Sequence, residues 1–214
     1  MTGPTVYIVD DDAHMLRAVV RLLRSYGYRT QSYPSAAQFL SQKLSLEVGC
    51  LVLDVRMPEI TGMDVQDILS RRDQHLPIVF ISGNADIESS VRAMKAGAID
   101  FLIKPFQDYQ LISAIRAALA LSEQALAERN ELMKDLSAFV SLSPREKQVC
   151  LGIAQGLLNK QIGFELGTAE RTIKVQRAHV MQKLRAQSVP DLVRLVERLR
   201  AAGAIQVSFA HFRP

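Results

Sequence analysis

Short apolar runs alternate with longer amphipathic segments through the first half of the chain. The apolar runs have the length of strands, and the amphipathic segments repeat their apolar residues at helical spacing. We therefore expect strands at residues 6–9, 29–33, 50–55, 78–82 and 100–103. We expect helices at residues 13–25, 35 to about 44, 62–72 and 87–96, and a long one from 108 onward.

The order of these elements predicts a domain of the α/β class. Five strand-then-helix units favour a doubly wound parallel sheet with helices on both faces. Near-continuous apolar runs are typical of strands that are buried on both sides. The five units span residues 4–121, which is an ordinary length for a single domain.

A helical linker is predicted to follow this domain, at residues 122–138. Residues 117–136 contain no Gly or Pro, so the last helix of the domain is expected to continue into the linker. Leu119, Leu126 and Met133 recur at seven-residue spacing. A short coiled-coil contact stays open as an alternative, although two heptads are too few to establish one.

The last segment, residues 139–203, is predicted to be an all-α domain of four helices. Ser143, Pro144 and Glu146 form the capping pattern of its first helix. The other helices are expected at 159–166, at 169–184 with Thr168 as its cap, and at 188–200. Two helices joined by a short turn within such a group indicate a helix-turn-helix unit.

The charge of the chain changes sign between these segments. Residues 1–138 carry 14 Lys and Arg against 17 Asp and Glu, a net charge of −3. Residues 139–214 carry 12 against 5, a net charge of +7. A basic segment behind an acidic one indicates two modules with different partners, and basic charge is typical of nucleic-acid binding.

Composition favours a cytoplasmic protein with packed cores and no membrane contact. Hydrophobic residues make up 48% of the chain, yet no apolar run is long enough to span a bilayer. The first residues lack the basic and apolar regions of a signal peptide. Cys50 and Cys150 lie 100 positions apart and form no disulfide or metal pattern, so we expect free thiols.

Polar residues end four of the five predicted strands. Asp10 and Asp11 follow the first strand, and Asp54, Ser82 and Lys104 end the third, fourth and fifth. In an open parallel sheet, ligands bind beyond the carboxyl ends of the strands. Carboxylates gathered there repel one another unless a cation joins them, and oxygen ligands without His or Cys suit Mg²⁺. The sequence therefore predicts a magnesium site at this edge.

The same edge offers the chemistry of phosphoryl transfer. Lys104 can pair with a phosphoryl oxygen and Ser82 can hydrogen-bond another, which leaves Asp54 as a nucleophile that forms an aspartyl-phosphate. In a simpler interpretation, Asp12 and a neighbour favour the dipole of the following helix, and Asp54 is a turn residue. That interpretation does not explain why acids and a lysine end separate strands in this order.

Residues 4–121 closely resemble the receiver domain of bacterial two-component response regulators, with every signature block present: VDDD, LVLDVRMPEITGMD, FISGNAD and MKAGAIDFLIKPF. The resemblance implies a flavodoxin-like fold and phosphorylation of Asp54 by a partner histidine kinase. It also implies the magnesium ligands. Asp11 and Asp54 would bind Mg²⁺ directly, Asp10 would bind it through water, and the Arg56 backbone carbonyl would be a further ligand.

The resemblance assigns roles to the remaining residues of this edge. Ser82 and Lys104 would bind the phosphoryl group, and Phe101 occupies the position of an aromatic switch residue. Phe101 is otherwise most simply a core or interface aromatic. The resemblance further implies that the Lys104–Pro105 peptide bond is cis, a form that is tolerated mainly before proline.

Residues 139 to about 200 resemble the LuxR-type helix-turn-helix domain of the NarL/FixJ family, through the run LSPREKQVCLGIAQGLLNKQIGFELGTAERTIKVQRAHVMQKL. The helix at 159–166 would be the scaffold, and the helix at 169–184 would be the recognition helix. Apolar residues at helical spacing should face the core, namely Ile173, Val180, Met181 and Leu184. Such a helix can enter a major groove and meet base edges with its first turns.

The DNA contacts follow from this placement. Phosphate contacts are expected from Lys160, Arg171 and Thr172. By resemblance, base-edge positions belong to Lys174, Val175 and Ala178, with Arg177 and His179 nearby. Gln176 and His179 depart from the residues that the family often has, which leaves the operator sequence open. The simpler interpretation of the basic residues, Lys183 and Arg185 among them, is a solvated helix face.

These inferences predict a transcriptional regulator that is not an enzyme. By resemblance to the family, phosphorylation of Asp54 would draw Ser82 inward, let Phe101 rotate, reshape residues 87–103 and so favour a homodimer that binds paired DNA half-sites. One alternative is a Mg²⁺-dependent phosphohydrolase, because Asp10 and Asp12 form a D-x-D pattern. Another is a phosphoryl relay whose basic tail binds protein. Turnover of phosphate monoesters and salt-dependent DNA binding would separate these alternatives.

Overall fold

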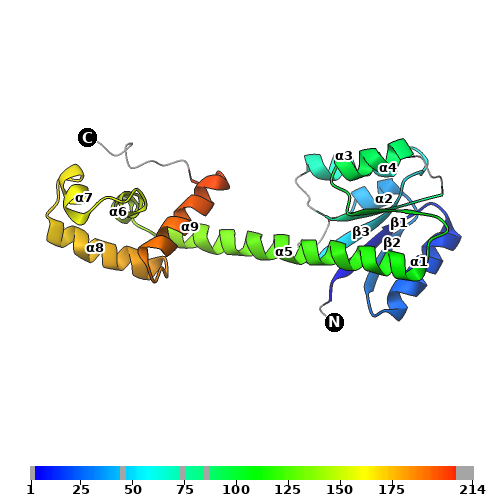
Figure 1. The fold of residues 1–214 in the computed structure, drawn as a ribbon, viewed down its shortest axis with the longest axis horizontal. Helices are drawn as coiled ribbons and strands as arrows, with labels where there is room; N and C mark the ends of the chain where they lie inside the picture. The colour runs from blue at the N-terminus through cyan, green and yellow to red at the C-terminus, as the bar shows by residue number, and fades with distance from the viewer. Residues whose placement is uncertain (1–2, 44–46, 73–75, 84–86, 206–214) are drawn as a thin grey trace. The chain divides into compact units, whose positions relative to one another are not determined.

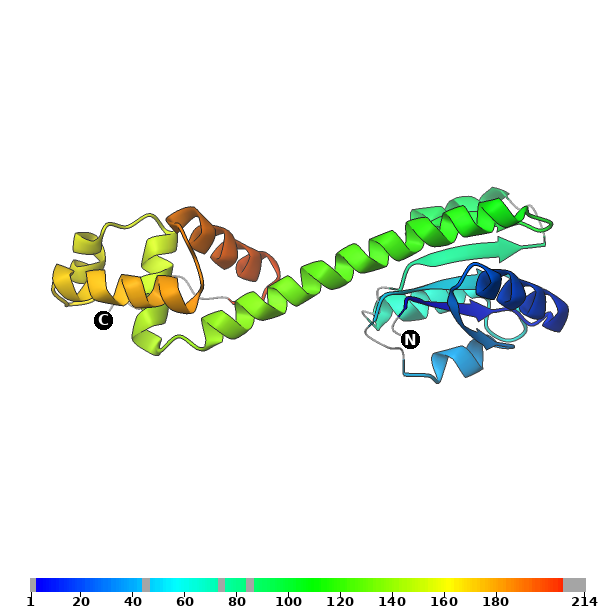
Figure 2. The same cartoon turned by 90° about the horizontal axis from the view of Figure 1, so that it is seen from below.

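A computed structural model describes residues 3–43, 47–72, 76–83 and 87–205. The chain divides into two compact units, Met1–Ala127 and Glu128–Pro214 (Figures 1 and 2). No helix in the described part of the chain is both long enough and apolar enough to cross a membrane. Each unit has a hydrophobic core of its own, and each is described separately below.

The first unit contains a five-stranded parallel sheet in the order β2-β1-β3-β4-β5. The strands are β1 (Thr5–Val9), β2 (Arg29–Tyr33), β3 (Gly49–Asp54), β4 (Ile78–Ser82) and β5 (Asp100–Ile103). The helices are α1 (Ala13–Ser25), α2 (Ala36–Leu40), α3 (Gly62–Arg71), α4 (Ile87–Lys95) and α5 (Asp108–Val140). The predicted parallel α/β fold is confirmed, and the strand bounds agree within one residue. Only α2 is clearly shorter than predicted, and residue 44 lies outside the described residues.

Helices cover both faces of the sheet because its central strands are apolar on both sides. In β1, Val6 and Ile8 pack under α1 and α5, whereas Tyr7 and Val9 pack under α2, α3 and α4. The backbone N–H of Gly49, at the start of β3, donates to the buried hydroxyl of Ser122 in α5 across 3.0 Å. This bond fastens α5 to the sheet beyond its apolar contacts.

The second unit is helical. Its helices are α6 (Pro144–Ala154), α7 (Asn159–Glu165), α8 (Glu170–Lys183) and α9 (Val189–Ala201), and the end of α5 packs against them through Phe139. Ile173, Val180 and Leu184 of the α8 region are buried in this core, as predicted, and Met181 packs against it. The predicted four-helix arrangement is therefore confirmed.

Serine side chains cap α6 and α9, whereas α7 and α8 have no side-chain bond at their N-caps. Ser143 caps α6, and Glu146 returns a hydrogen bond to its backbone N–H, which completes the predicted capping box. The prediction that Thr168 caps α8 is wrong, because Ala169 is the cap and provides no side-chain bond. The Thr168 hydroxyl instead accepts a hydrogen bond from the guanidinium of Arg145. A contact with a residue that is distant in sequence has replaced a local one.

Candidate functional site

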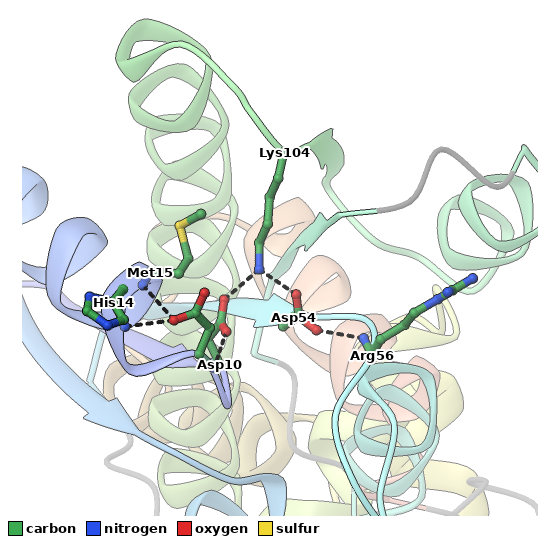
Figure 3. Close-up of polar contacts among 7 residues, drawn as sticks. Asp10, His14, Met15, Asp54, Arg56 and Lys104 are labelled. Atoms are coloured by element: carbon green, nitrogen blue, oxygen red, sulfur yellow. Dashed lines mark hydrogen bonds and ion pairs between the residues drawn. The ribbon is translucent and has the colours of Figure 1, made fainter.

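Asp10, Asp54 and Lys104 meet at the carboxyl edge of the sheet (Figure 3). The Lys104 ammonium lies 2.7 Å from Oδ2 of Asp10 and 2.6 Å from Oδ1 of Asp54. The three residues follow or end β1, β3 and β5. Because these strands are parallel, their polar ends gather at one edge, as the sequence predicted.

Burial and charge oppose each other at this edge. Both carboxylate residues are at most 5% exposed. Burial raises the pKa of Asp54, and the hydrogen bond and charge of Lys104 oppose that rise. Burial alone would lower the pKa of Lys104, but its bonds to Asp10 and Asp54 outweigh burial and raise that pKa. The ammonium therefore supplies the positive charge that holds two neighbouring carboxylates together.

The other two acids of the triplet face outward. Asp12 caps α1, because its Oδ1 accepts from the backbone N–H of His14 at 2.7 Å and of Met15 at 3.3 Å. These two bonds lower the pKa of Asp12. The simpler interpretation is therefore correct for Asp12. Asp11 is exposed, and the structure does not group its side chain with those of Asp10 and Asp54.

Backbone pairing places Ser82 beside Lys104. The backbone N–H of Lys104 donates to the carbonyl of Ser82 across 2.7 Å, and Ser82 is 2% exposed. The Lys104–Pro105 peptide bond is cis, as the resemblance implied. Phe101 is half-buried, with its ring 6.2 Å from that of Phe80.

The loop after β3 completes the site around Asp54. The backbone N–H of Arg56 donates to Oδ2 of Asp54 across 2.7 Å, while the Arg56 side chain points away from the carboxylates (Figure 3). A Cβ on Gly62 would stand 2.3 Å from the carbonyl oxygen of Asp54 and 3.1 Å from the ring of Phe80. Gly62 is thus required for the close return of the chain. Gly62 was assigned no role from the sequence. The available signal was its place at the start of the predicted helix 62–72, in the loop that follows Asp54.

The carboxylate oxygens at this edge are of the type that a hard cation prefers. The side chains, however, are not arranged around a cation site. Among the residues that the structure describes, no three Asp, Glu, His or Cys side chains are arranged to hold a metal ion. All four carboxylate oxygens of Asp10 and Asp54 accept a bond from Lys104 or from a backbone N–H. Of the predicted ligands, Asp10 and Asp54 lie together at the Lys104 ammonium, and Asp11 stands outside this cluster. The backbone of Arg56 contacts Asp54 through its N–H.

The second unit presents one exposed face of α8. Side chains on this face recur at three- and four-residue spacing and are exposed: Arg171, Lys174, Val175, Ala178 and His179. Thr172 in the first turn of α8 and Lys160 in the first turn of α7 are also exposed. Seven of the eight predicted DNA-contacting residues are therefore accessible.

Arg177, the eighth, is half-buried and donates to Oδ1 of Asn159 in α7 across 3.3 Å. Lys183 pairs with the carboxylate of Glu146 in α6 at 2.7 Å. Both cations thus have partners within the unit. These pairs could not be predicted from the sequence, because Arg177 and Asn159 lie 18 positions apart and Lys183 and Glu146 lie 37 positions apart.

Comparison with protein families matches both units. Residues 6–116 match the family described as response regulator receiver domain. Residues 140–196 match the family described as bacterial regulatory proteins, luxR family. The first match alone spans half of the chain.

Individual proteins are similar over both units. The response regulator protein TmoT of Ectopseudomonas mendocina is 47% identical over 195 residues, which cover 91% of this chain and 89% of TmoT. The transcriptional regulatory protein FixJ of Azorhizobium caulinodans is 42% identical over 193 residues, covering 89% and 90%. The solved structure of the response regulator StyR is 44% identical with a TM-score of 0.83, covering 92% of this chain and all of that one.

Proposed function

This chain belongs to the response regulators that join a receiver domain to a LuxR-type DNA-binding domain, and from that premise we propose that Asp54 is its phosphoryl acceptor. The observation that carries the proposal is the ammonium of Lys104, 2.6 Å from the buried carboxylate of Asp54. A cation at that distance can also pair with the oxygens of a phosphoryl group on the same carboxylate. The donor would be a phosphohistidine on a partner kinase.

The transfer requires one bond to form and one to break. An oxygen of the Asp54 carboxylate attacks phosphorus, the P–N bond to the histidine breaks, and the imidazole leaves with the electron pair. The Arg56 backbone N–H, bonded to the second carboxylate oxygen, keeps the nucleophile oriented. The Lys104 ammonium pairs with the phosphoryl oxygens and stabilises the negative charge that develops on them. We propose that the enzymatic chemistry of the chain is limited to this aspartate.

Mg²⁺ is the cation that this donor set fits, because its side-chain ligands are carboxylates and its backbone ligand is a carbonyl. Asp54, Asp11 and the Arg56 carbonyl would hold it directly, and Asp10 through water. Two buried carboxylates close to one ammonium leave a net negative charge for the ion to neutralise. When bound, it supplies charge neutralisation for phosphoryl transfer. Asp11 would have to turn inward, since its side chain is exposed.

Ser82 and Phe101 are proposed to report the phosphoryl group to the surface. Ser82 is buried at the end of β4, next to the backbone of Lys104. Phe101 lies half-buried one strand away, where a shift of Ser82 would give its ring room. The change would be a population shift between two arrangements, driven by bonds that only the phosphorylated form makes.

The proposed output is a homodimer that forms on α4 and β5. Apolar side chains on these elements are exposed to an unusual degree: Ile87 by 79%, Val91 by 45%, Met94 by 46% and Ile103 by 49%. Exposed apolar side chains gathered on neighbouring elements mark an interaction surface. Two receivers joined there would bring two α8 helices to paired half-sites in the cytoplasm, where the DNA lies.

The kinase is proposed to approach along α1, which begins at the acidic edge. Arg17, Arg21 and Arg24 lie four and three positions apart on α1 and border a hollow of about 380 Å³. Residues 13–46 contain no Asp or Glu, so this surface suits an acidic partner. We expect Arg21→Glu to slow phosphorylation by a kinase and to leave phosphorylation by acetyl phosphate unchanged. An equal loss with both donors would argue against docking on α1.

Light scattering in the presence of Mg²⁺ tests the central proposal. Beryllofluoride on an aspartate mimics an acyl phosphate, so it should shift the wild-type mass toward the dimer and leave Asp54→Asn unchanged. A mass shift in both proteins would show that Asp54 is not the acceptor. No shift in either would contradict phosphorylation-linked dimerisation. Multiple turnover of a phosphate monoester would instead favour a phosphohydrolase.

A further inference from the structure

The first turn of α6 carries two adjacent side chains that reach opposite ends of α8. Arg145 donates through Nη2 to the carbonyl of Leu166 across 2.6 Å, and also to the Thr168 hydroxyl. Glu146 accepts through Oε2 from the ammonium of Lys183 across 2.7 Å. Leu166 and Thr168 lie in the turn just before α8, and Lys183 is the last residue of α8.

Arg145 binds a carbonyl at a helix end, and both side chains have a second bond close to their own position on α6. Leu166 is the C-cap of α7, so its carbonyl has no partner within that helix. Arg145 is itself held in place, because its Nη1 donates to Oε1 of Gln148 across 3.0 Å. The Glu146 oxygen that binds Lys183 also accepts from the backbone N–H of Ser143. The two side chains are therefore fixed on α6 as well as on α8.

Apolar packing alone defines the orientation of α8 less sharply than the bonds of Arg145 and Glu146 do. Ile173 and Val180 are buried along one stripe of a 14-residue helix that is about 20 Å long, and its C-cap, Leu184, is buried as well. The hydrophobic effect that holds this stripe is not directional, so the orientation of the helix there depends on the fit of the side chains. Hydrogen bonds at both ends are directional, and they oppose rotation and tilt.

We propose that Arg145 and Glu146 are positioning residues that set the orientation of α8 for reading base edges. The proposal rests on the function proposed above, that α8 enters the major groove. Hydrogen bonds to base edges need a defined distance and angle, whereas phosphate contacts depend mainly on charge. Loosening either end of α8 should therefore weaken binding to a preferred sequence more than binding to DNA in general.

The test compares two probes on the full chain. One probe is the duplex that the wild-type protein enriches from a random-sequence library, and the other is the unselected library. Kd is measured for both across a salt series, well below the melting temperature of each variant. A residue that contributes only to stability would lower the melting temperature without changing the ratio of the two Kd values.

The variants separate the two ends of α8. Arg145→Gln removes the bonds to the turn, and Glu146→Gln removes the charge facing Lys183 while keeping an acceptor for the Ser143 N–H. Lys147→Gln is the matched control, because it removes one charge from α6, and the Lys147 ammonium lies over the Phe139 ring, 5.8 Å from its centroid. Thr168→Val removes the second hydrogen-bond partner of Arg145. It is the alternative test of this end of α8 if Arg145→Gln does not fold.

We expect Arg145→Gln and Glu146→Gln each to weaken specific binding about tenfold and to leave library binding within about twofold. Lys183→Gln should match Glu146→Gln, and the double variant should add little to either. Lys147→Gln should leave the ratio unchanged. A ratio unchanged in Arg145→Gln and Glu146→Gln would overturn the proposal.

Two other outcomes would also contradict part or all of the proposal, each for a different reason. If Lys183→Gln weakens both probes equally and lowers the salt slope by about one, Lys183 is a phosphate contact and the Glu146 half of the proposal fails. If the wild-type protein enriches no sequence, the proposed function of α8 fails, and the positioning role fails with it.

Discussion

The ammonium of Lys104 lies 2.6 Å from Oδ1 of Asp54, and this contact joins the ends of β3 and β5 at a buried edge. Asp10 shares the same ammonium at 2.7 Å. The receiver thus holds a carboxylate that burial alone would drive toward its neutral form. Lys104 opposes that tendency, so it favours the ionised form of Asp54, which is the form that the proposed phosphoryl transfer requires.

Removing Lys104 should therefore destabilise the receiver. In Lys104→Met, two buried carboxylates would face each other without a counter-charge, and we expect a loss of about 2–3 kcal/mol at pH 7.5. The loss should be smaller at pH 4, because acid favours the protonated form of Asp54 and so removes the repulsion. Urea denaturation followed by circular dichroism at both pH values measures it. Lys95→Met, an exposed lysine of α4, is the control and should change little.

Asp54→Asn should have the opposite effect on stability. Burial raises the pKa of Asp54 above its unfolded value, so its contribution to stability is present below that value and is lost as pH rises through the folded pKa. Asn carries no charge and avoids this loss. Without Mg²⁺, we expect the variant to be at least as stable as wild type at pH 7, with the difference shrinking toward pH 3. A variant less stable at pH 7 would contradict this account.

Salt dependence should separate the two kinds of proposed DNA contact. Lys160→Gln should lower the slope of log K against log salt by about one and weaken all sequences alike. Val175→Ala should leave the slope unchanged and alter the preference at about one base pair, since Val175 is uncharged and 51% exposed. Lys134→Gln, on an exposed part of α5, removes the same charge as a control. A slope change in this control would show that the effect is non-specific.

Arg185, the second residue after α8, offers a test of backbone strain. Arg185 has a φ of +53°, in the left-handed region where glycine is favoured. Arg185→Gly should raise the free energy of unfolding of the second unit by about 1 kcal/mol. Calorimetry of the full chain would show it as a higher melting temperature for one transition. If Arg185→Ala gives an equal gain, loss of charge is responsible and strain is not.

The α7–α8 turn leaves no space for a side chain at Gly163. A Cβ there would stand 2.6 Å from the backbone carbonyl of Thr168, so the turn would have to move. We expect Gly163→Ala to cost about 2 kcal/mol and to weaken DNA binding. Gly83→Ala is the matched control, since nothing lies within 4 Å of its Cβ position. Equal stability of the two variants would show that the turn yields without cost.

Hydrophobic periodicity and local caps were enough to predict most of the fold. The strands were placed within one residue, and the Ser143–Glu146 capping box was identified from residues three positions apart. The gathering of Asp10, Asp54 and Lys104 also followed, because the order of parallel strands determines which ends meet. These inferences succeed because periodicity and capping depend on residues a few positions apart, and because few topologies connect five such units.

Tertiary structure decided the partners of those polar groups that neither a local cap nor the strand order specifies. The outward position of Asp11, the bond from Arg145 to Thr168 and the pairing of Arg177 with Asn159 all depend on rotamers and on segments that are distant in the chain. A side chain has several staggered conformations, and packing against other elements selects among them. The sequence by itself thus determined the elements, their order and the residues at the sheet edge. Packing decided the contacts of each side chain, because their energies depend on distances and angles that only the folded chain defines.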